Sequence, residues 1–436
     1  MDYFRGIVGI VFIIGLATLF SKDKKSIDWR LVILGLTIQI IFGLLIGRVE
    51  VTQQAFGFLS KQFVKFLSFA QKGAEFLYGD LAKNSDNNPG VRHNLGFLFA
   101  FQALPTVIFF SSITAGLYYL GVLQKVVYGF AWLMAKTMRL SGSESLSASA
   151  NIFMGQTESP LLVRPFIEKM TQSELHCVMV GGMATLAGSV LGAYVSFLGG
   201  GDPVQQAHFA SYLLSASIMN APAAIILAKI SFPENERDKI NSKLEVNKEQ
   251  LGTSVIEAIA RGAADGLKLA LNIGAMLLAF IAVIFAINWV LVDFIGALTG
   301  LNDWVSHSTN GVYSGFSLQY ILGQVFRIFA FLIGIDWNES LQVGSLLGQK
   351  MVINEFVAYL DLANMKAAGT LSEKSIRIST YCLCGFANFA SIAIQIGGIG
   401  GMAPSRTGDL AKLGMRAMFA ASLATMMTGA IAGMIF

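Results

Sequence analysis

The most constraining feature of this chain is the number and length of its apolar runs. The stretch 266–297, for example, is apolar almost throughout. A bilayer core needs about 20 consecutive apolar residues per spanning helix, because every backbone polar group must be satisfied within the segment. With 54% hydrophobic and 13% charged residues, the chain carries more apolar surface than one aqueous globule buries. These features predict an all-α polytopic membrane protein, and the alternating segments of a β-barrel are missing from the sequence.

Hydrophobic runs predict eight transmembrane helices. Their ranges are 4–20, 31–47, 94–121, 174–199, 207–230, 266–297, 376–399 and 409–435. A ninth apolar segment, 51–78, has Phe56, Leu59 and Phe63 at helical spacing with Lys61 and Lys65 on its other side. This pattern favours a helix that lies in the membrane interface. A soluble surface helix is the alternative.

Two further segments are too polar at their centres to cross lipid and too apolar to be ordinary loops. They are 141–168 and 337–363, and we interpret both as re-entrant helical hairpins. Each begins with Glu-Ser-Leu, at Glu144 and Glu339, and each reaches a second glutamate, Glu158 or Glu355, near its tip. Each is also preceded by an amphipathic stretch and followed by a helix interrupted by small and polar residues. The chain is therefore predicted to be duplicated.

An odd number of membrane crossings separates the two copies, so the second copy is expected to be inverted. Inverted repeats with discontinuous helices are the architecture of secondary transporters. We expect four parts: N-terminal scaffold helices with the interfacial helix (1–93), a first repeat (94–230), a cytoplasmic loop with an interfacial segment (231–265) and a second repeat (266–436).

The charged residues give the expected orientation and partners. The net charge of +4 is scattered over loops, which favours membrane lipid and not nucleic acid as a partner. The first loop, 21–30, is basic and is expected in the cytoplasm, as is the loop 229–252, whereas both termini should lie outside. The cysteines, Cys177, Cys382 and Cys384, fall in apolar segments and predict neither a disulfide nor a zinc site.

Polar groups at membrane depth are costly and are functional candidates. The first tip offers Gln156, Thr157 and Glu158, and the second tip with its broken helix adds Asn354, Glu355, Asn388 and Ser391. Such a set suits a neutral polyhydroxylated or amide-bearing solute. Two alternatives are interhelical hydrogen bonds with no ligand and a pair of catalytic or metal-ligating carboxylates. No His, Cys or Asp accompanies the glutamates at ligand spacing, which disfavours the second.

Several motifs resemble those of the concentrative nucleoside transporter family. They are Gly155-Gln156-Thr157-Glu158-Ser159-Pro160, Val163-Arg164-Pro165, Asn354-Glu355-Phe356-Val357-Ala358-Tyr359, Cys384-Gly385-Phe386-Ala387-Asn388-Phe389 and Ile394-Gln395-Ile396-Gly397-Gly398. The likeness runs over nearly all of the chain. The eight-helix form is similar to bacterial members, so the resemblance implies a multi-pass protein of the bacterial inner membrane that forms a homotrimer.

The resemblance also implies roles for individual residues. Gln156 and Thr157 would bind the nucleobase with Glu158 close by, Glu355, Asn388 and Ser391 would hold the ribose, and Val190 and Phe386 would shape the pocket. The sodium site would use the side chains of Asn151 and Thr185 and the carbonyls of Met154 and Leu186. Bacterial sodium-coupled members typically carry serine at this position. Thr185 differs from serine but retains the hydroxyl group.

The resulting hypothesis is a symporter that imports nucleosides such as uridine, with sodium as the coupling ion and no other cofactor. A proton-coupled symporter and a facilitator or channel for a small polar solute are the alternatives. An intramembrane enzyme would need a nucleophile and a base, and neither is found.

Overall fold

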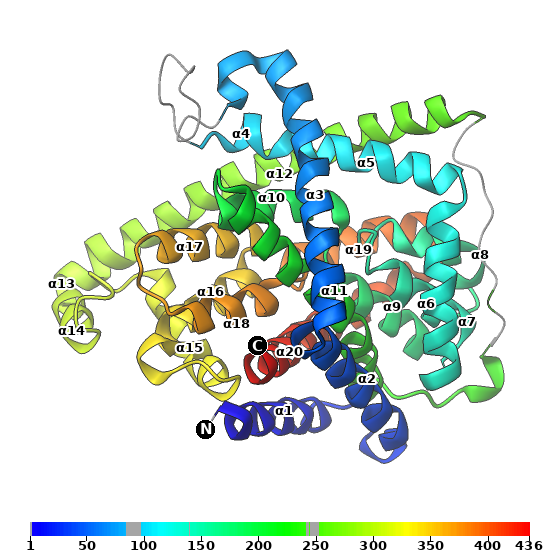
Figure 1. Ribbon diagram of the computed structural model, residues 1–436. Helices are drawn as coiled ribbons and strands as arrows, with labels where there is room; N and C mark the ends of the chain where they lie inside the picture. Colours follow the sequence, from blue (N-terminus) through cyan, green and yellow to red (C-terminus); the bar gives the residue numbers. More distant parts are fainter. Residues whose placement is uncertain (1, 84–96, 139, 241–243, 245–252) are drawn as a thin grey trace.

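The computed structural model describes residues 2–83, 97–138, 140–240, 244 and 253–436, and within these residues every regular element is helical. The α-helices are α1 (Asp2–Leu19), α2 (Trp29–Arg48), α3 (Glu50–Tyr78), α4 (Phe99–Gln102), α5 (Leu104–Tyr119), α6 (Val122–Met138), α7 (Gly142–Ala150), α8 (Arg164–Ile167), α9 (Gln172–Ala184), α10 (Gly188–Gly199), α11 (Pro203–Ser231), α12 (Val255–Asn288), α13 (Ala297–Thr299), α14 (Leu301–Ser308), α15 (Leu318–Leu332), α16 (Trp337–Val352), α17 (Glu355–Ala367), α18 (Glu373–Leu383), α19 (Phe389–Met402) and α20 (Thr407–Ile435) (Figure 1). A π-helical segment, Trp289–Gly296, extends α12.

Six helical stretches in the described part of the chain are long and apolar enough to cross a membrane. They are Trp29–Arg48, Phe99–Tyr119, Gln172–Gly199, Pro203–Ser231, Val255–Thr299 and Pro404–Ile435. The predicted spans 4–20 and 376–399 instead contain the shorter apolar helix α1 and the pair α18–α19. The structure thus confirms a helical protein with several apolar helices, and the total of eight crossings stays a prediction.

The segment expected in the membrane interface forms the single 29-residue helix α3. It passes across α11 and α5, both of which it contacts (Figure 1). Its buried side is narrow and consists of Ser60, Leu67, Ala70 and Ala74. The helix is therefore confirmed, and its position in the interface stays a prediction.

The two segments expected to form hairpins have arms of unequal regularity. In the second segment, α16 and α17 contact each other and only Ile353 and Asn354 separate them. Asn354 caps α17 by accepting a hydrogen bond of 3.0 Å from the Val357 amide. In the first segment α7 is followed by an irregular tip and then by short helical turns up to Ile167. Pro160 and Pro165 in this returning arm lack amide donors, which explains why no long α-helix forms there.

Both predicted interrupted helices are broken, and the two breaks touch. The first helix ends at Ala184 and resumes at Gly188, and the second ends at Leu383 and resumes at Phe389. Gly385 in the second break has a φ of +154°. A Cβ atom on this glycine would lie 2.7 Å from the carbonyl oxygen of Ala184. Glycine is therefore needed here both for its backbone conformation and for the close approach.

The two segments start at opposite ends of the molecule. Near the start of α1, Arg5 forms an ion pair of 2.7 Å with Asp336, the residue before α16. Beyond the end of α1, the Lys22 amide donates to the Ser231 carbonyl at 3.0 Å, and the nearby Lys229 pairs with Glu144 in α7. Because α1 spans the distance between these contacts, α7 and α16 begin near opposite ends of α1. The inverted repeat itself stays a prediction.

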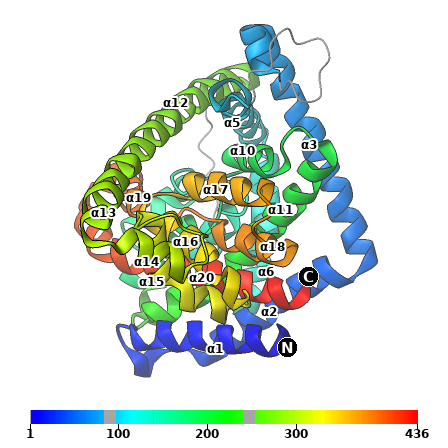
Figure 2. The ribbon, with the colours of Figure 1, turned by 90° about the vertical axis from the view of Figure 1, so that its left-hand side faces the viewer.

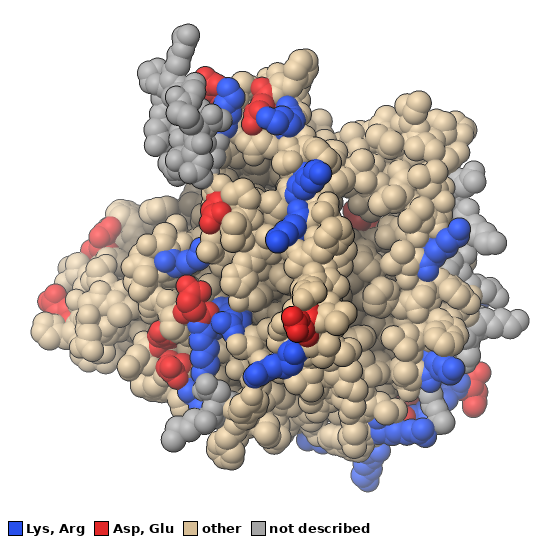
Figure 3. All heavy atoms as spheres, viewed as in Figure 1, with Lys and Arg blue, Asp and Glu red and all other residues tan. Residues whose placement is uncertain are grey.

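The most buried helices form the centre of the molecule. In the apolar window of Gln172–Gly199, 94% of the residues are buried, but in that of Val255–Thr299 only 6% are. In Figure 2, α12, α3 and α1 surround the central helices, with α12 along one edge. On the face drawn in Figure 3, acidic and basic side chains lie in small groups, and most of the surface between the groups is uncharged. The exposed α12 is thus an apolar surface that lipid or another protein chain must cover.

The predicted division into four parts is not tested by these contacts. The predicted boundary at 93, residues 94–96 of the first repeat, and residues 241–243 and 245–252 of the cytoplasmic loop lie outside the described residues.

Candidate substrate and cation site

One cavity lies where the two tips and the two helix breaks meet, and α12 closes one side of it. It is lined by all eight residues expected to contact the substrate: Gln156, Thr157, Glu158, Val190, Glu355, Phe386, Asn388 and Ser391. These residues come from positions up to 235 residues apart in the chain. The structure therefore brings together the complete predicted substrate set.

Glu355 is one of two carboxylates that line this cavity, and both of its oxygens accept hydrogen bonds. The Tyr194 hydroxyl donates to Oε1 at 3.0 Å, and the Asn388 amide donates to Oε2 at 2.9 Å. The side chain of Asn388 also caps α19, because its Oδ1 accepts from the Ser391 amide at 2.9 Å. Two neutral donors thus orient the Glu355 carboxylate, which retains acceptor capacity for further donors.

Gln156 links the first tip to the second broken helix. Its Nε2 donates to the Ser391 hydroxyl at 3.1 Å. Three other polar atoms of residues lining the cavity are buried without a hydrogen-bond partner in the described structure, namely Oε1 of Gln156, Oγ of Ser189 and Nδ2 of Asn354. Unpaired buried polar atoms are costly. Because all three atoms lie around one cavity, we expect a polar ligand or water in the cavity to form their hydrogen bonds.

Glu158 has a different environment from Glu355. Its Oε2 accepts a hydrogen bond of 3.2 Å from the Gly155 amide, so this carboxylate folds back on its own tip. Because the tip is irregular, its backbone amides are free to be bound in this way. Glu158 therefore stabilises the shape of the tip and still lines the cavity.

Apolar side chains form the other wall of the cavity. Val190 and Phe386 were expected there, and the structure adds Leu269, Ile273 and Met276 from α12. A flat ring system would bury its faces against such a wall, whereas its edges would reach the polar tips. The combination fits a ligand with a planar apolar part and several hydrogen-bonding groups.

The four residues expected to bind sodium lie at the first tip and the first helix break, and all four are buried. These two segments pack together, because the Gly188 amide donates to the Phe153 carbonyl at 3.2 Å. Oδ1 of Asn151 accepts from the Ser159 hydroxyl at 2.5 Å, and the Thr185 hydroxyl donates to the Gly181 carbonyl at 2.9 Å. The available groups are amide, hydroxyl and carbonyl oxygens, which is the donor set that suits a hard cation such as sodium.

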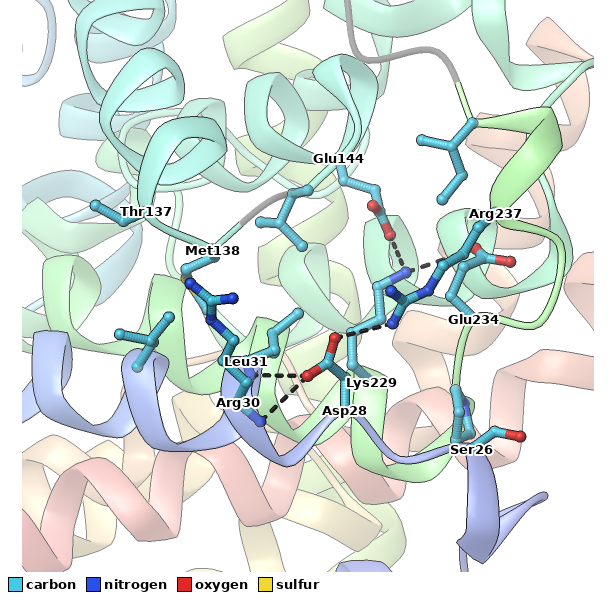
Figure 4. Close-up of a pocket in the computed structure, with 14 residues that line it drawn as sticks. Ser26, Asp28, Arg30, Leu31, Thr137, Met138, Glu144, Lys229, Glu234 and Arg237 are labelled. Carbon is cyan, nitrogen blue, oxygen red and sulfur yellow. Dashed lines mark hydrogen bonds and ion pairs between the residues drawn. The ribbon is translucent and has the colours of Figure 1, made fainter.

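A second polar pocket lies at the end of the molecule where α7 begins (Figure 4). Lys229 forms ion pairs there with Glu144 and, at 3.8 Å, with Glu234. Arg237 pairs with Asp28 at 2.9 Å, which joins the loop before α2 to the loop after α11. Acidic and basic side chains balance each other in this pocket, so its interactions are structural and distinct from the candidate site.

Three parts of the candidate site were missed from the sequence. Tyr194 and the α12 side chains lie within apolar runs and carry no local signal. Ser189 stands at the end of the small-residue stretch 181–189, and that position beside a helix break was the available signal.

Three family profiles match successive parts of the chain. Residues 8–81 match the profile described as the N-terminus of Na⁺-dependent nucleoside transporters, and residues 212–433 match the profile of their C-terminus. Residues 100–201 match a profile described as nucleoside recognition. The three profiles together cover most of the chain.

Relatives match along the whole length. The chain is 42% identical to an uncharacterized transporter of Haemophilus influenzae, with 100% of this chain and 98% of that protein aligned. It is 40% identical to solute carrier family 28 member 3 of Eptatretus stoutii over 98% of this chain, and 40% identical to sodium/nucleoside cotransporter 1 of Mus musculus over 95% of this chain. The chain spans 60% and 61% of these two animal relatives.

Solved structures agree with these relatives. The inward-facing, substrate-bound structure of CNTnw is 40% identical and superposes with a TM-score of 0.87, covering 100% of this chain and 99% of that chain. A variant of CNTnw in an outward-facing state gives a TM-score of 0.88 at 40% identity, covering 100% of this chain and 98% of that chain. The cavity, the three profiles and these full-length matches establish that the chain belongs to the Na⁺-dependent, concentrative nucleoside transporter family and is a multi-pass membrane transporter, not an enzyme.

Proposed function

We propose that this protein is a sodium-coupled symporter that imports nucleosides across the bacterial inner membrane by alternating access. The observation that carries the proposal is the cavity in which Glu355, held by two neutral donors, lies beside three buried polar atoms that have no hydrogen-bond partner among the described residues. Such a cavity suits a neutral solute that has hydroxyl groups and a polar heterocycle. A nucleoside such as uridine has both.

In this proposal Glu355, Asn388 and Ser391 bind the ribose. The ribose diol donates to the Glu355 carboxylate through charge-assisted hydrogen bonds, which are stronger than neutral ones. Gln156 and Thr157 bind the edge of the nucleobase. Glu158 lies close to the base and contacts it partly through water. Val190 and Phe386 contact the faces of the ligand. The free Oε1 of Gln156 supports the assignment to the base, since it is a buried acceptor without a donor.

Sodium would bind at the first tip through the side chains of Asn151 and Thr185 and the carbonyls of Met154 and Leu186. The family name supports a sodium-coupled mechanism, as does the printed description of one relative as a sodium/nucleoside cotransporter. An ion at this place would hold the first tip against the broken helix. Because Gln156 and Glu158 belong to the same tip, the ion and the nucleoside would stabilise one conformation and bind cooperatively.

Alternating access would use the inverted pair of hairpins, whose segments start at opposite ends of α1. The exposed apolar surface of α12 supports assembly into a homotrimer, in which other copies of the chain cover part of it. Lipid would cover the rest.

The test is uptake of labelled uridine by the purified protein in sealed liposomes with an imposed inward sodium gradient. We expect uridine to accumulate above its external concentration and to leave when the gradient is dissipated. Accumulation driven by a proton gradient alone would support proton coupling, and equilibration without either ion would support a facilitator. If no nucleoside were taken up, the proposal would be wrong.

A matched pair of variants tests the site itself. Glu355→Gln removes the charge from the ribose acceptor and should weaken uridine binding by about tenfold to more than a hundredfold, since a hydrogen bond to a charged group contributes about 1.5–3 kcal/mol. Glu373→Gln, an exposed glutamate at the start of α18, should bind uridine as the unmodified protein does. Equal affinities for the two variants would show that the ribose assignment is wrong.

A further inference from the structure

Lys350 is a buried lysine that the substrate cavity does not use. It lies in the last turn of α16, its residue is 3% exposed, and it is not among the residues that line the cavity. Its Nζ donates hydrogen bonds of 2.8 Å to the Cys382 carbonyl and of 2.8 Å to the Thr425 hydroxyl. Burying an ammonium group is unfavourable unless its surroundings compensate it. The groups that contact the ammonium of Lys350 therefore indicate the role of its charge.

The acceptor of the first bond belongs to the carbonyl end of α18. Three carbonyl groups at this end are bound by side chains from three other helices. The Tyr359 hydroxyl donates to Thr380 at 2.8 Å, Lys350 donates to Cys382, and the Asn220 amide donates to Cys384 at 2.6 Å. A helix carries partial negative charge at its carbonyl end. The ammonium group thus lies where a cation is most favourable, beside the second helix break.

In the part of the chain that the structure describes, no lysine or arginine donates to the carbonyl end of the first broken helix. α9 ends at Ala184 as α18 ends at Leu383, and the first tip packs on it as the second tip packs on α18. A Cβ atom on Gly181 would lie 3.0 Å from Nδ2 of Asn151, which shows how closely the tip approaches. Among the described residues, no side chain donates a hydrogen bond to the carbonyl of Ala184 or Leu186. This is the place where the proposed function puts sodium.

The two halves therefore present corresponding sites, each made of a hairpin arm, the carbonyl end of a broken helix and a following long helix. Ser217 of α11 donates to the Ile152 carbonyl at 3.0 Å in the first half, and Thr425 of α20 accepts from Lys350 in the second. The site in the first half offers oxygen atoms and no charged group, whereas the site in the second half contains the ammonium group of Lys350. We propose that Lys350 is a positioning residue that acts as a permanently attached cation in place of a second sodium ion, so that the second hairpin is ordered without an ion.

This inference rests on the proposed function and makes two predictions about the ion. The unmodified protein should couple one sodium ion to each nucleoside, and its sodium dependence should be hyperbolic. Removal of the ammonium should leave the Cys382 carbonyl and the Thr425 hydroxyl as ligands around a space that a second sodium ion can enter. Asparagine at position 350 would add one more oxygen ligand to that space, whereas methionine would fill it without offering any.

The experiment is titration of uridine binding against sodium for Lys350→Asn, Lys350→Met and Lys350→Arg in the full-length purified protein. We expect Lys350→Asn to show a sigmoidal sodium dependence, with a Hill coefficient that rises from about 1 toward 2, and to regain its affinity at high sodium. Lys350→Met should bind uridine at least about tenfold more weakly at every sodium concentration. Lys350→Arg should keep the hyperbolic dependence. Lys412→Asn, an exposed change on α20, is the matched control.

Two results would overturn the inference. One is wild-type affinity with a hyperbolic sodium dependence in Lys350→Asn. The other is loss of binding in Lys350→Asn and Lys350→Met that sodium does not restore, because that would show a purely structural role. If the variants do not fold, the reversal potential of the unmodified protein in liposomes measures how many sodium ions are coupled to each nucleoside. We expect one sodium ion, and a value of two would contradict the inference. Failure of the unmodified protein to bind uridine in a sodium-dependent way would instead refute the proposed function.

Discussion

Tyr194 donates a hydrogen bond of 3.0 Å to Glu355, and this contact joins α10 to α17. The hydroxyl binds one carboxylate oxygen and leaves the other to Asn388. The acceptor that we assign to the ribose is therefore oriented by residues from both halves of the chain.

Tyr194→Phe should weaken uridine binding by about tenfold, because Glu355 loses one of the two charge-assisted hydrogen bonds that orient it. The measurement is isothermal titration calorimetry with uridine and with 2′,3′-dideoxyuridine, for which the loss should be smaller. Tyr359→Phe is the control, since its ring stacks on Tyr194 at 4.5 Å but its hydroxyl binds the Thr380 carbonyl. Equal losses for both nucleosides would contradict a role in ribose binding.

Gly182→Ala should impair nucleoside binding without removing any polar group from the cavity. A Cβ atom at this position would lie 3.0 Å from the Cβ of Gln156 and 2.7 Å from Nε2 of Gln395, so Gln156 must shift. Gly397→Ala should have no such effect, because no atom lies within 4 Å of its added Cβ. Uridine affinity measured for the two variants tests the position of Gln156, and similar values would count against it.

Gly385→Ala should destabilise the whole protein. The substitution combines a φ of +154° with a Cβ atom 2.7 Å from the Ala184 carbonyl oxygen. Strained backbone of this kind costs on the order of 1–3 kcal/mol. A thermal melt of the detergent-solubilised protein should show a clearly lower midpoint, whereas Gly401→Ala, with open space around its Cβ, should melt like the unmodified chain.

Glu144→Gln should also lower the melting temperature strongly. The carboxylate is 1% exposed, and the buried Lys229 would keep only its longer pair of 3.8 Å with Glu234. Loss of the closer partner of a buried ammonium group costs up to about 3–5 kcal/mol. Glu236→Gln breaks the exposed pair with Lys239 and should cost about 0–1 kcal/mol. Replacing both members of the buried pair, as Glu144→Gln with Lys229→Met, should be less harmful than Glu144→Gln alone. A double variant less stable than the single one would exclude a direct pair.

Much of the candidate site could be predicted from the sequence, because polar groups are rare in apolar segments and each one is therefore informative. Gln156, Glu355 and Asn388 stand at breaks in otherwise apolar helices, and the structure places all of them around one cavity. The interruptions predicted within 174–199 and 376–399 are found between Ala184 and Gly188 and between Leu383 and Phe389.

Other features could not be predicted, for physical reasons that differ. Tyr194 lies in an apolar run, where an aromatic residue commonly packs against other helices, and its partner is 161 residues away. Ile273 of α12 is buried, but its residue type does not distinguish it from exposed apolar neighbours on the same helix such as Leu271 and Leu278. The short helical turns of 159–167 depend on Pro160 and Pro165, and the apolar pattern of this segment carries no information on helix length.

The contact between Gly385 and the Ala184 carbonyl has a mechanical consequence. The two backbones touch with no side chain between them, so there is no deformable layer to absorb a displacement. A shift of one broken helix along its axis must push the other directly. A ligand that moves either break by a fraction of an ångström is thus felt at once in the opposite half of the molecule.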